Sequence, residues 1–197
     1  QASAALSQYG DVHTRVDANA GILLAAGGFA RNSALRRRYH GDLDGTLSSA
    51  PLDDMGDALI AAQSIGAGDE FTEHAWWMPS LMIAPGAPAI TLAERALPGA
   101  MIVDRRGKRF MNEAQNSMAA GAAIISHDGA KNPPWLVFDS RYLTRYTAGA
   151  LSSSEARESM EAHGFLVTAG SISGLAARMG VPAAVLQQSI ATFNRAA

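Results

Sequence analysis

The chain has 197 residues, of which 48% are hydrophobic and 17% charged, and a formal net charge of -2 at pH 7. This composition supports a folded core and argues against disorder. A near-neutral charge provides no basic field for phosphate backbones, so nucleic acid is not expected as a partner. The absence of cysteine excludes disulfides and thiolate catalysis. No apolar run reaches the roughly 18 residues of a membrane span, and we expect a cytoplasmic protein.

The first elements in the chain are two strands and a helix. Asp11–Asp17 alternates apolar and polar residues, which predicts a half-exposed strand, and the apolar run Gly21–Ala26 predicts a buried strand. Met55–Ile65 carries apolar residues at helical spacing. Asp53 or Asp54 is the expected cap of this helix.

Prolines interrupt the next stretch, Trp77–Pro98. Proline removes a backbone donor and fixes φ, so this stretch is predicted to be loop and crossover. We expect a domain boundary here, with residues 1–77 in a first domain and residues 78–197 in a second. Trp76 and Trp77 lie at this boundary. If they occupy a strand, their side chains point to opposite sides and only one faces a given pocket.

Pro98–Ser117 combines an apolar strand, a basic turn and an Asn-Glu pair at a tight spacing. Ala100–Val103 predicts a buried strand, the residues around Gly107 a polar turn, and Arg109-Phe110 a second short strand. The resulting hairpin delivers Glu113 to one end.

The remaining sequence predicts an alternation dominated by helices. Ser152 and Glu155 form a capping box for one helix, and Gly180 ends another. The expected elements are a helix near 116–125, a strand over 135–138, helices after Asp139 and from Ser152, a helix over 171–179 and a last helix after Pro182.

Three sequence blocks, in this order, resemble the FAD-dependent 3-ketosteroid 1-dehydrogenase and fumarate reductase flavoprotein family. They are GILLAAGGFAR from Gly21, PLDDMGDALIAAQSIGA from Pro51, and the ER..PG..VD..G.RF.NE pattern that begins at Glu94. A G-x-G-x-x-G turn, which binds the pyrophosphate of a dinucleotide, is absent from this sequence. The resemblance therefore implies an internal fragment of such a protein.

The resemblance implies an α/β (α+β) fold class, with part of an FAD-binding Rossmann-like domain followed by part of an α+β substrate (cap) domain. FAD is the implied cofactor. The glycine pair also has a simpler explanation as a turn that needs positive φ, and Gly56 with its neighbour as an ordinary helix start. The implied cofactor-binding residues are Ala25, Gly27, Gly28, Gly56 and Asp57.

Other residues are implied at the substrate and at the reaction centre. Trp76 and Trp77 are candidates for an aromatic wall of the substrate site, although core packing is the better explanation for either one alone. Arg109 and Glu113 form a surface ion pair by default. The resemblance instead puts them near the reactive side of the flavin, where Arg109 orients an electron-rich group and Glu113 anchors the loop.

Ser117 is the clearest departure from the family pattern. The steroid dehydrogenases have a Tyr there that resembles the base of the reaction, and the fumarate reductases an Arg that donates a proton. An alcohol is a far weaker acid than a phenol, so Ser117 cannot replace the tyrosine without another base. Either another group is the base, or the reaction differs, or the variant is impaired.

The leading hypothesis is an FAD-dependent dehydrogenase acting on a ketone-activated substrate such as a 3-ketosteroid, with hydride passing to flavin and a proton to a protein base. An external electron acceptor is then a required partner, and a homo-oligomer is left open. The alternatives are a fumarate-reductase-like flavoprotein and a non-catalytic fold that holds no FAD. The five histidines show no ligand spacing, so no metal is expected and they are predicted to face solvent or to pack.

Overall fold

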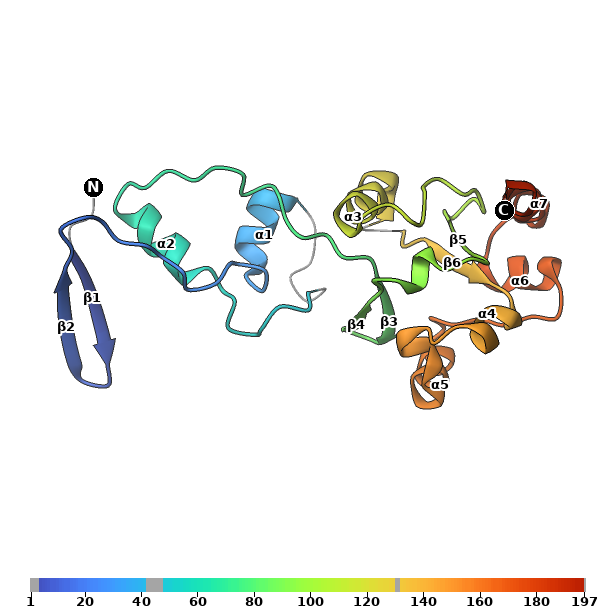
Figure 1. Cartoon of the computed structure of the whole chain (residues 1–197), viewed down its shortest axis with the longest axis horizontal. Coiled ribbons are helices and arrows are strands. Elements are labelled where there is room, and N and C mark those ends of the chain that lie inside the picture. The colour runs from blue at the N-terminus through green and yellow to red at the C-terminus, as the bar shows by residue number, and fades with distance from the viewer. Residues whose placement is uncertain (1–3, 42–47, 130–131, 197) are drawn as a thin grey trace.

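The computed structural model describes residues 4–41, 48–129 and 132–196. It confirms a mixture of helices and strands, and all of the strand pairs within those ranges are antiparallel. The molecule is elongated, with the β1–β2 hairpin at one end and α6 and α7 at the other (Figure 1). The elements are β1 (Ala4–Tyr9), β2 (Val12–Asp17), α1 (Ser33–His40), α2 (Asp57–Ser64), β3 (Ser80–Ala84), β4 (Ala87–Ile90), η1 (Glu94–Ala96), β5 (Ala100–Val103), α3 (Ser117–Ile124), η2 (Ile125–Gly129), β6 (Trp135–Phe138), α4 (Ser140–Arg145), η3 (Gly149–Ser152), α5 (Ser154–Ala162), α6 (Ile172–Met179) and α7 (Ala183–Ala196).

The N-terminal strands differ from the prediction in their burial. β2 pairs with β1 and every residue of it is exposed, so it is a strand but not a half-buried one. The predicted buried strand over Gly21–Ala26 is wrong: this run has no strand geometry, and Leu23 is 90% exposed. A strand becomes buried only when neighbours pair with it and a layer covers it. No strand in the described ranges pairs with residues 21–26.

The predicted helix around Met55–Ile65 is present as α2, but it starts later and without an aspartate cap. Its first residue is Asp57, and its N-cap is Gly56, which has φ of 83° and no side-chain bond to the helix. Asp53 and Asp54 precede the cap, so the prediction that either of them caps α2 is wrong. The Asp54 carboxylate is bonded elsewhere, to the backbone of Gly28.

The proline-rich stretch contains a β-hairpin, so its description as loop and crossover is wrong. β3 and β4 pair antiparallel, with Met82 opposite Pro88 and a register shift between Met82 and Ala84. Proline is tolerated at bulges and sheet edges, where a missing N–H breaks no ladder bond. Gly86, with φ of 73°, lies in the turn after Pro85.

β5 is the most buried strand and separates two hydrophobic clusters. Met101 and Val103 pack with α6 and α7 in the first cluster, whereas Ala100 packs with α4 and α5 in the second. Alternate residues of a strand face opposite sides, which explains the division. β6 pairs with β5 as the apolar runs predicted. Both clusters draw their members only from Leu81 onward.

The C-terminal helices follow the predicted order. α6 begins after the cap Ser171 and ends at Gly180, which has φ of 68°, and Leu186 buries the face of α7. The predicted Ser152–Glu155 capping box is wrong by one residue, because the hydroxyl of Ser153 accepts the N–H of Ala156 and caps α5. No helix in the described part of the chain is long and apolar enough to cross a membrane.

Candidate functional site

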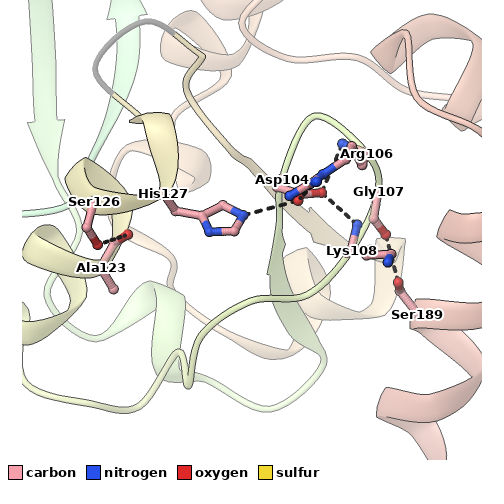
Figure 2. Close-up of polar contacts among 8 residues, drawn as sticks. All are labelled: Asp104, Arg106, Gly107, Lys108, Ala123, Ser126, His127 and Ser189. Atoms are coloured by element: carbon pink, nitrogen blue, oxygen red, sulfur yellow. Dashed lines mark hydrogen bonds and ion pairs between the residues drawn. The ribbon is translucent and has the colours of Figure 1, made fainter.

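The basic turn after β5 is organised by Asp104 (Figure 2). Its carboxylate accepts the backbone N–H groups of Arg106 and Lys108, both at 2.9 Å, and lies 3.1 Å from His127 Nε2. Burial favours a higher pKa for Asp104, but the bonds from Lys108, His127 and Arg106 outweigh burial and lower the pKa below 3.8. Asp104 is therefore a charged cap for the turn, and its partners are held by it.

The same turn rests on α7, which explains its glycine. The hydroxyl of Ser189 donates to the carbonyl of Gly107 at 2.7 Å (Figure 2). A Cβ on Gly107 would lie 3.3 Å from the backbone nitrogen of Leu186, and its φ is 76°. Beyond the turn, the predicted second strand at Arg109-Phe110 is only an isolated bridge between Arg109 and Val103, so that prediction is wrong in extent. The chain turns away to reach Glu113.

Glu113 and Arg109 are bonded to each other at the hairpin end. Arg109 Nη2 lies 2.6 Å from Glu113 Oε2, and the Glu113 side chain is 6% exposed. Glu113 Oε1 also accepts the backbone N–H of Ile102 at 2.8 Å, and Arg109 lies over the ring of Phe193 at 5.2 Å. These contacts fasten the hairpin end to β5 and α7.

Ser117 meets a residue that the sequence analysis did not select, Arg95. Arg95 Nη2 donates to Ser117 Oγ at 3.2 Å, and Nη1 donates to the carbonyl oxygen of Glu113. Arg95 is 4% exposed, and burial lowers the pKa of its guanidinium. Its place in the Glu94-Arg95 pair of the family pattern was the signal that could have found it.

The two glycine blocks of the N-terminal half come together. Gly28 donates its N–H to Asp54 Oδ1 at 2.5 Å, and a Cβ on Gly27 would lie 2.8 Å from the same oxygen. Ala25, Gly27 and Gly28 are exposed. Gly27 also has φ of 83°, so both a turn and a close approach require glycine there.

Gly56 is buried beside these residues. A Cβ on Gly56 would lie 2.8 Å from atoms of both Leu35 and Phe29. Tight packing within the protein therefore explains this glycine, which is also the N-cap of α2. Asp57 follows as the exposed first residue of α2.

A groove of about 740 Å³ is lined by residues from both the N-terminal and the C-terminal half of the chain. Ala30 and Asp54 line it from the N-terminal half, and Arg95, Ile102 and Gly121 from the C-terminal half. Both candidate glycines lie next to this wall, because Gly28 is bonded to Asp54. Arg109, Glu113 and Ser117 are not among the residues that line the groove, and Arg95 connects it to the last two.

Trp76 and Trp77 both line the groove, so the prediction that only one of them faces a pocket is wrong. Their segment is not a strand, and the alternation rule does not apply. Trp76 is 84% exposed at the rim. Trp77 is packed against neighbouring residues. A Cβ on Gly121 would lie 2.4 Å from Trp77 Cβ, and the ring centroids of Trp77 and His40 are 5.0 Å apart.

His40 also lines the groove, and its ring packs edge-on against that of Trp77. Its Nε2 lies 2.9 Å from the carbonyl oxygen of Thr72, so Nε2 carries the proton. Burial lowers its pKa, despite that bond, and Arg36 lowers it further. Burial and Arg36 therefore favour the neutral imidazole of His40. Among the described residues, no group of histidine and acidic side chains could hold a metal.

Comparison with known proteins covers nearly all of the chain. The family model "FAD binding domain" matches residues 4–197. The 3-oxosteroid 1-dehydrogenase of Mycobacterium tuberculosis is 32% identical over 188 residues, which are 91% of this chain and 33% of that protein. The 4-oxocyclohexanecarboxylate 2-dehydrogenase of Sinomonas cyclohexanicum is 35% identical over 190 residues, or 91% of this chain and 32% of that protein.

Solved structures of flavoproteins are similar to this chain in fold. The 3-ketosteroid delta1-dehydrogenase of Sterolibacterium denitrificans has a TM-score of 0.79 and 32% identity, over 95% of this chain and 35% of that one. A flavocytochrome c3 fumarate reductase, at 20% identity and a TM-score of 0.57 over 92% of this chain and 30% of that one, shares the fold. The chain spans about a third of the length of these relatives. It belongs to the FAD-binding flavoprotein family that includes the 3-oxosteroid 1-dehydrogenases and the fumarate reductases.

Proposed function

We propose that the chain is part of an FAD-dependent dehydrogenase that removes two hydrogens from neighbouring carbon atoms of a cyclic ketone, with a 3-ketosteroid as the preferred substrate. The observation that carries the proposal is the groove, whose largely apolar lining includes the buried cation Arg95. Relatives named for 3-oxosteroids and for 4-oxocyclohexanecarboxylate support the choice of a ring ketone.

The exposed glycine turn fits a flat cofactor. Gly27 and Gly28 present backbone without a Cβ, next to the Asp54 wall of the groove. We assign FAD binding to this turn together with Ala25, Gly56 and Asp57. When bound, FAD supplies the acceptor for a hydride, and an external electron acceptor is required afterwards. We place the boundary between the FAD-binding part and the substrate (cap) part between residues 77 and 78. Residues on both sides of this boundary line the groove.

The aromatic and aliphatic wall suits an apolar ring system. Trp77 is fixed against α3 and His40, whereas Trp76 is free to cover a ligand from the rim. Rigid aromatic side chains bury a large area at a small entropic cost. We assign both tryptophans to substrate binding.

The substrate loses one hydride and one proton, and a carbon–carbon double bond forms between the two carbon atoms. With FAD bound, the hydride would pass to the flavin and the proton to a base of the protein. His40 and Asp54 line the groove and are able to accept it. Arg109 and Glu113 hold the hairpin end in position. Ser117, which is too weak a base for this step, contributes through its bond to Arg95.

Anaerobic bleaching of the flavin tests the proposal. The full-length protein that carries this chain is purified, its visible spectrum recorded, and a 3-ketosteroid added without oxygen. Loss of the flavin absorbance supports the proposed dehydrogenation. No bleaching by ketones, together with reoxidation of chemically reduced flavin by fumarate, would replace it with the fumarate-reductase-like alternative. A colourless protein that takes up no added FAD would leave the non-catalytic fold.

A further inference from the structure

Arg95 is a buried cation that has no acidic partner in the described part of the chain. Its residue surface is 4% exposed, and none of the ion pairs found among the described residues includes it. Buried charges are normally paired, because taking an ion out of water costs several kcal/mol. An arginine in this position therefore needs a reason beyond the fold.

Its protein partners are neutral and do not use all its donors. A guanidinium has five N–H groups. Nη1 is bonded to the carbonyl oxygen of Glu113 and Nη2 to the hydroxyl of Ser117, while Nε is buried without a partner in the part of the chain that is described. An unsatisfied buried donor on a charged group is costly, so a further acceptor completes the site.

The carboxylate of Glu113, whose backbone meets Arg95, is already paired. The Glu113 side chain is bonded to Arg109 and to the N–H of Ile102, and only its backbone oxygen meets Arg95. Asp54 lines the same groove but is bonded to the backbone of Gly28, and Arg95 has no ion-pair partner among the described residues. It lines the groove with Ile102 and Leu136, in apolar surroundings that strengthen its attraction for a negative oxygen.

We propose that Arg95 is the oxyanion-binding residue of the groove, which holds the ketone oxygen of the substrate and favours its negatively charged enolate form. Ser117 is a positioning residue: its hydroxyl oxygen accepts the Nη2 bond and fixes the guanidinium. This inference rests on the proposed function, because it names the group that polarises the ketone in that reaction. It also gives the serine a role different from that of a base.

Binding of an enolate mimic tests the inference without any turnover. The chain is titrated with 2,6-difluorophenol, whose ¹⁹F NMR signal reports its ionisation even when flavin is present. We expect the phenolate to bind between roughly tenfold and 1000-fold more tightly than the neutral phenol, as expected for an opposite charge nearby. The non-ionisable control 2,6-difluoroanisole should bind weakly and independently of pH.

Variants identify the residue. Arg95→Met should abolish the preference for phenolate, Arg95→Lys should retain part of it, and Arg106→Met, which removes an exposed arginine outside the groove, should leave it unchanged. If Arg95→Met does not fold by circular dichroism, the ¹⁵N signal of Arg95 Nε in the unmodified chain decides, since it must move during the titration.

A neutral-phenol preference, or an unchanged phenolate preference in folded Arg95→Met, would overturn the inference. So would a stationary Arg95 Nε signal. The proposed function fails separately: flavin that no ketone bleaches, in a protein whose Arg95 still binds phenolate, contradicts the dehydrogenation and leaves the oxyanion site standing.

Discussion

Arg109→Gln tests how strongly the Arg109–Glu113 pair holds the hairpin end. The Glu113 side chain is 6% exposed, and the variant leaves its carboxylate without a counter-ion. The N–H of Ile102 is then its remaining donor among the described residues. Removing one partner of a buried pair costs about 3 to 5 kcal/mol. Because the Arg109 side chain is itself 37% exposed, water reaches the gap. We expect the free energy of unfolding to fall by about 3 kcal/mol.

Arg141→Gln is the matched control. Arg141 Nη2 lies 2.7 Å from Asp139 Oδ2, but the Asp139 side chain is 51% exposed. The carboxylate stays in water when its partner is removed, and exposed pairs contribute about 0 to 1 kcal/mol. Chemical denaturation of each purified variant, followed by circular dichroism, measures the two losses.

A double variant completes the test. Adding Glu113→Gln to Arg109→Gln removes the buried charge, so part of the lost stability should return, with a coupling energy of about 1 to 3 kcal/mol. Equal losses for Arg109→Gln and Arg141→Gln would refute the reasoning. A double variant no more stable than Arg109→Gln alone would do the same.

Three further predictions concern packing and ionisation. Gly121→Ala should lower the melting temperature, because the new Cβ would lie 2.4 Å from Trp77 Cβ. The cost of overpacking, about 1 to 3 kcal/mol, outweighs the gain in helix propensity of about 1 kcal/mol. A higher melting temperature would contradict this prediction. Asp104→Asn should lower the free energy of unfolding by about 1 to 3 kcal/mol at neutral pH. Because the pKa of Asp104 in the folded protein lies below 3.8, the difference from wild type should shrink as the pH falls through that lowered pKa. Urea titrations at several pH values would measure this difference. Burial raises the pKa of Tyr142 to about 12, so the alkaline ultraviolet titration of wild type minus Tyr142→Phe should show that midpoint, and one near 10 would disprove it.

Local signals in the sequence predicted the C-terminal half well. Ser171 and Gly180 bound α6 as expected, because caps act on the adjacent helical turn. The missed hairpin β3–β4 shows the limit of such signals. Proline disfavours regular strands, so a break was predicted at Pro88. Pro88 instead pairs with Met82 next to a register shift, where a missing N–H is tolerated.

Burial and charge balance depend on contacts between distant residues, and here the sequence was less informative. The run at Gly21–Ala26 has strand-like composition but nothing among the described residues to pair with. At the site, Arg109 and Glu113 do form the predicted ion pair, but the prediction that it lies on the surface is wrong, because the Glu113 side chain is 6% exposed. The bond between Asp54 and Gly28, and the lack of a counter-ion for Arg95, became visible only when distant segments met.

Both hydrophobic clusters lie at or beyond Leu81, and this has a consequence for how the chain opens. Amide hydrogens of β5 and β6 should exchange with solvent slowest, since they are released only by global unfolding, whereas those of β1 and β2 should exchange through local fluctuations. A protease should accordingly trim the chain from its N-terminal side and leave a resistant fragment containing the helices α3 to α7. Cooperative unfolding, followed by calorimetry, would then report on that fragment and hardly at all on the glycine turn.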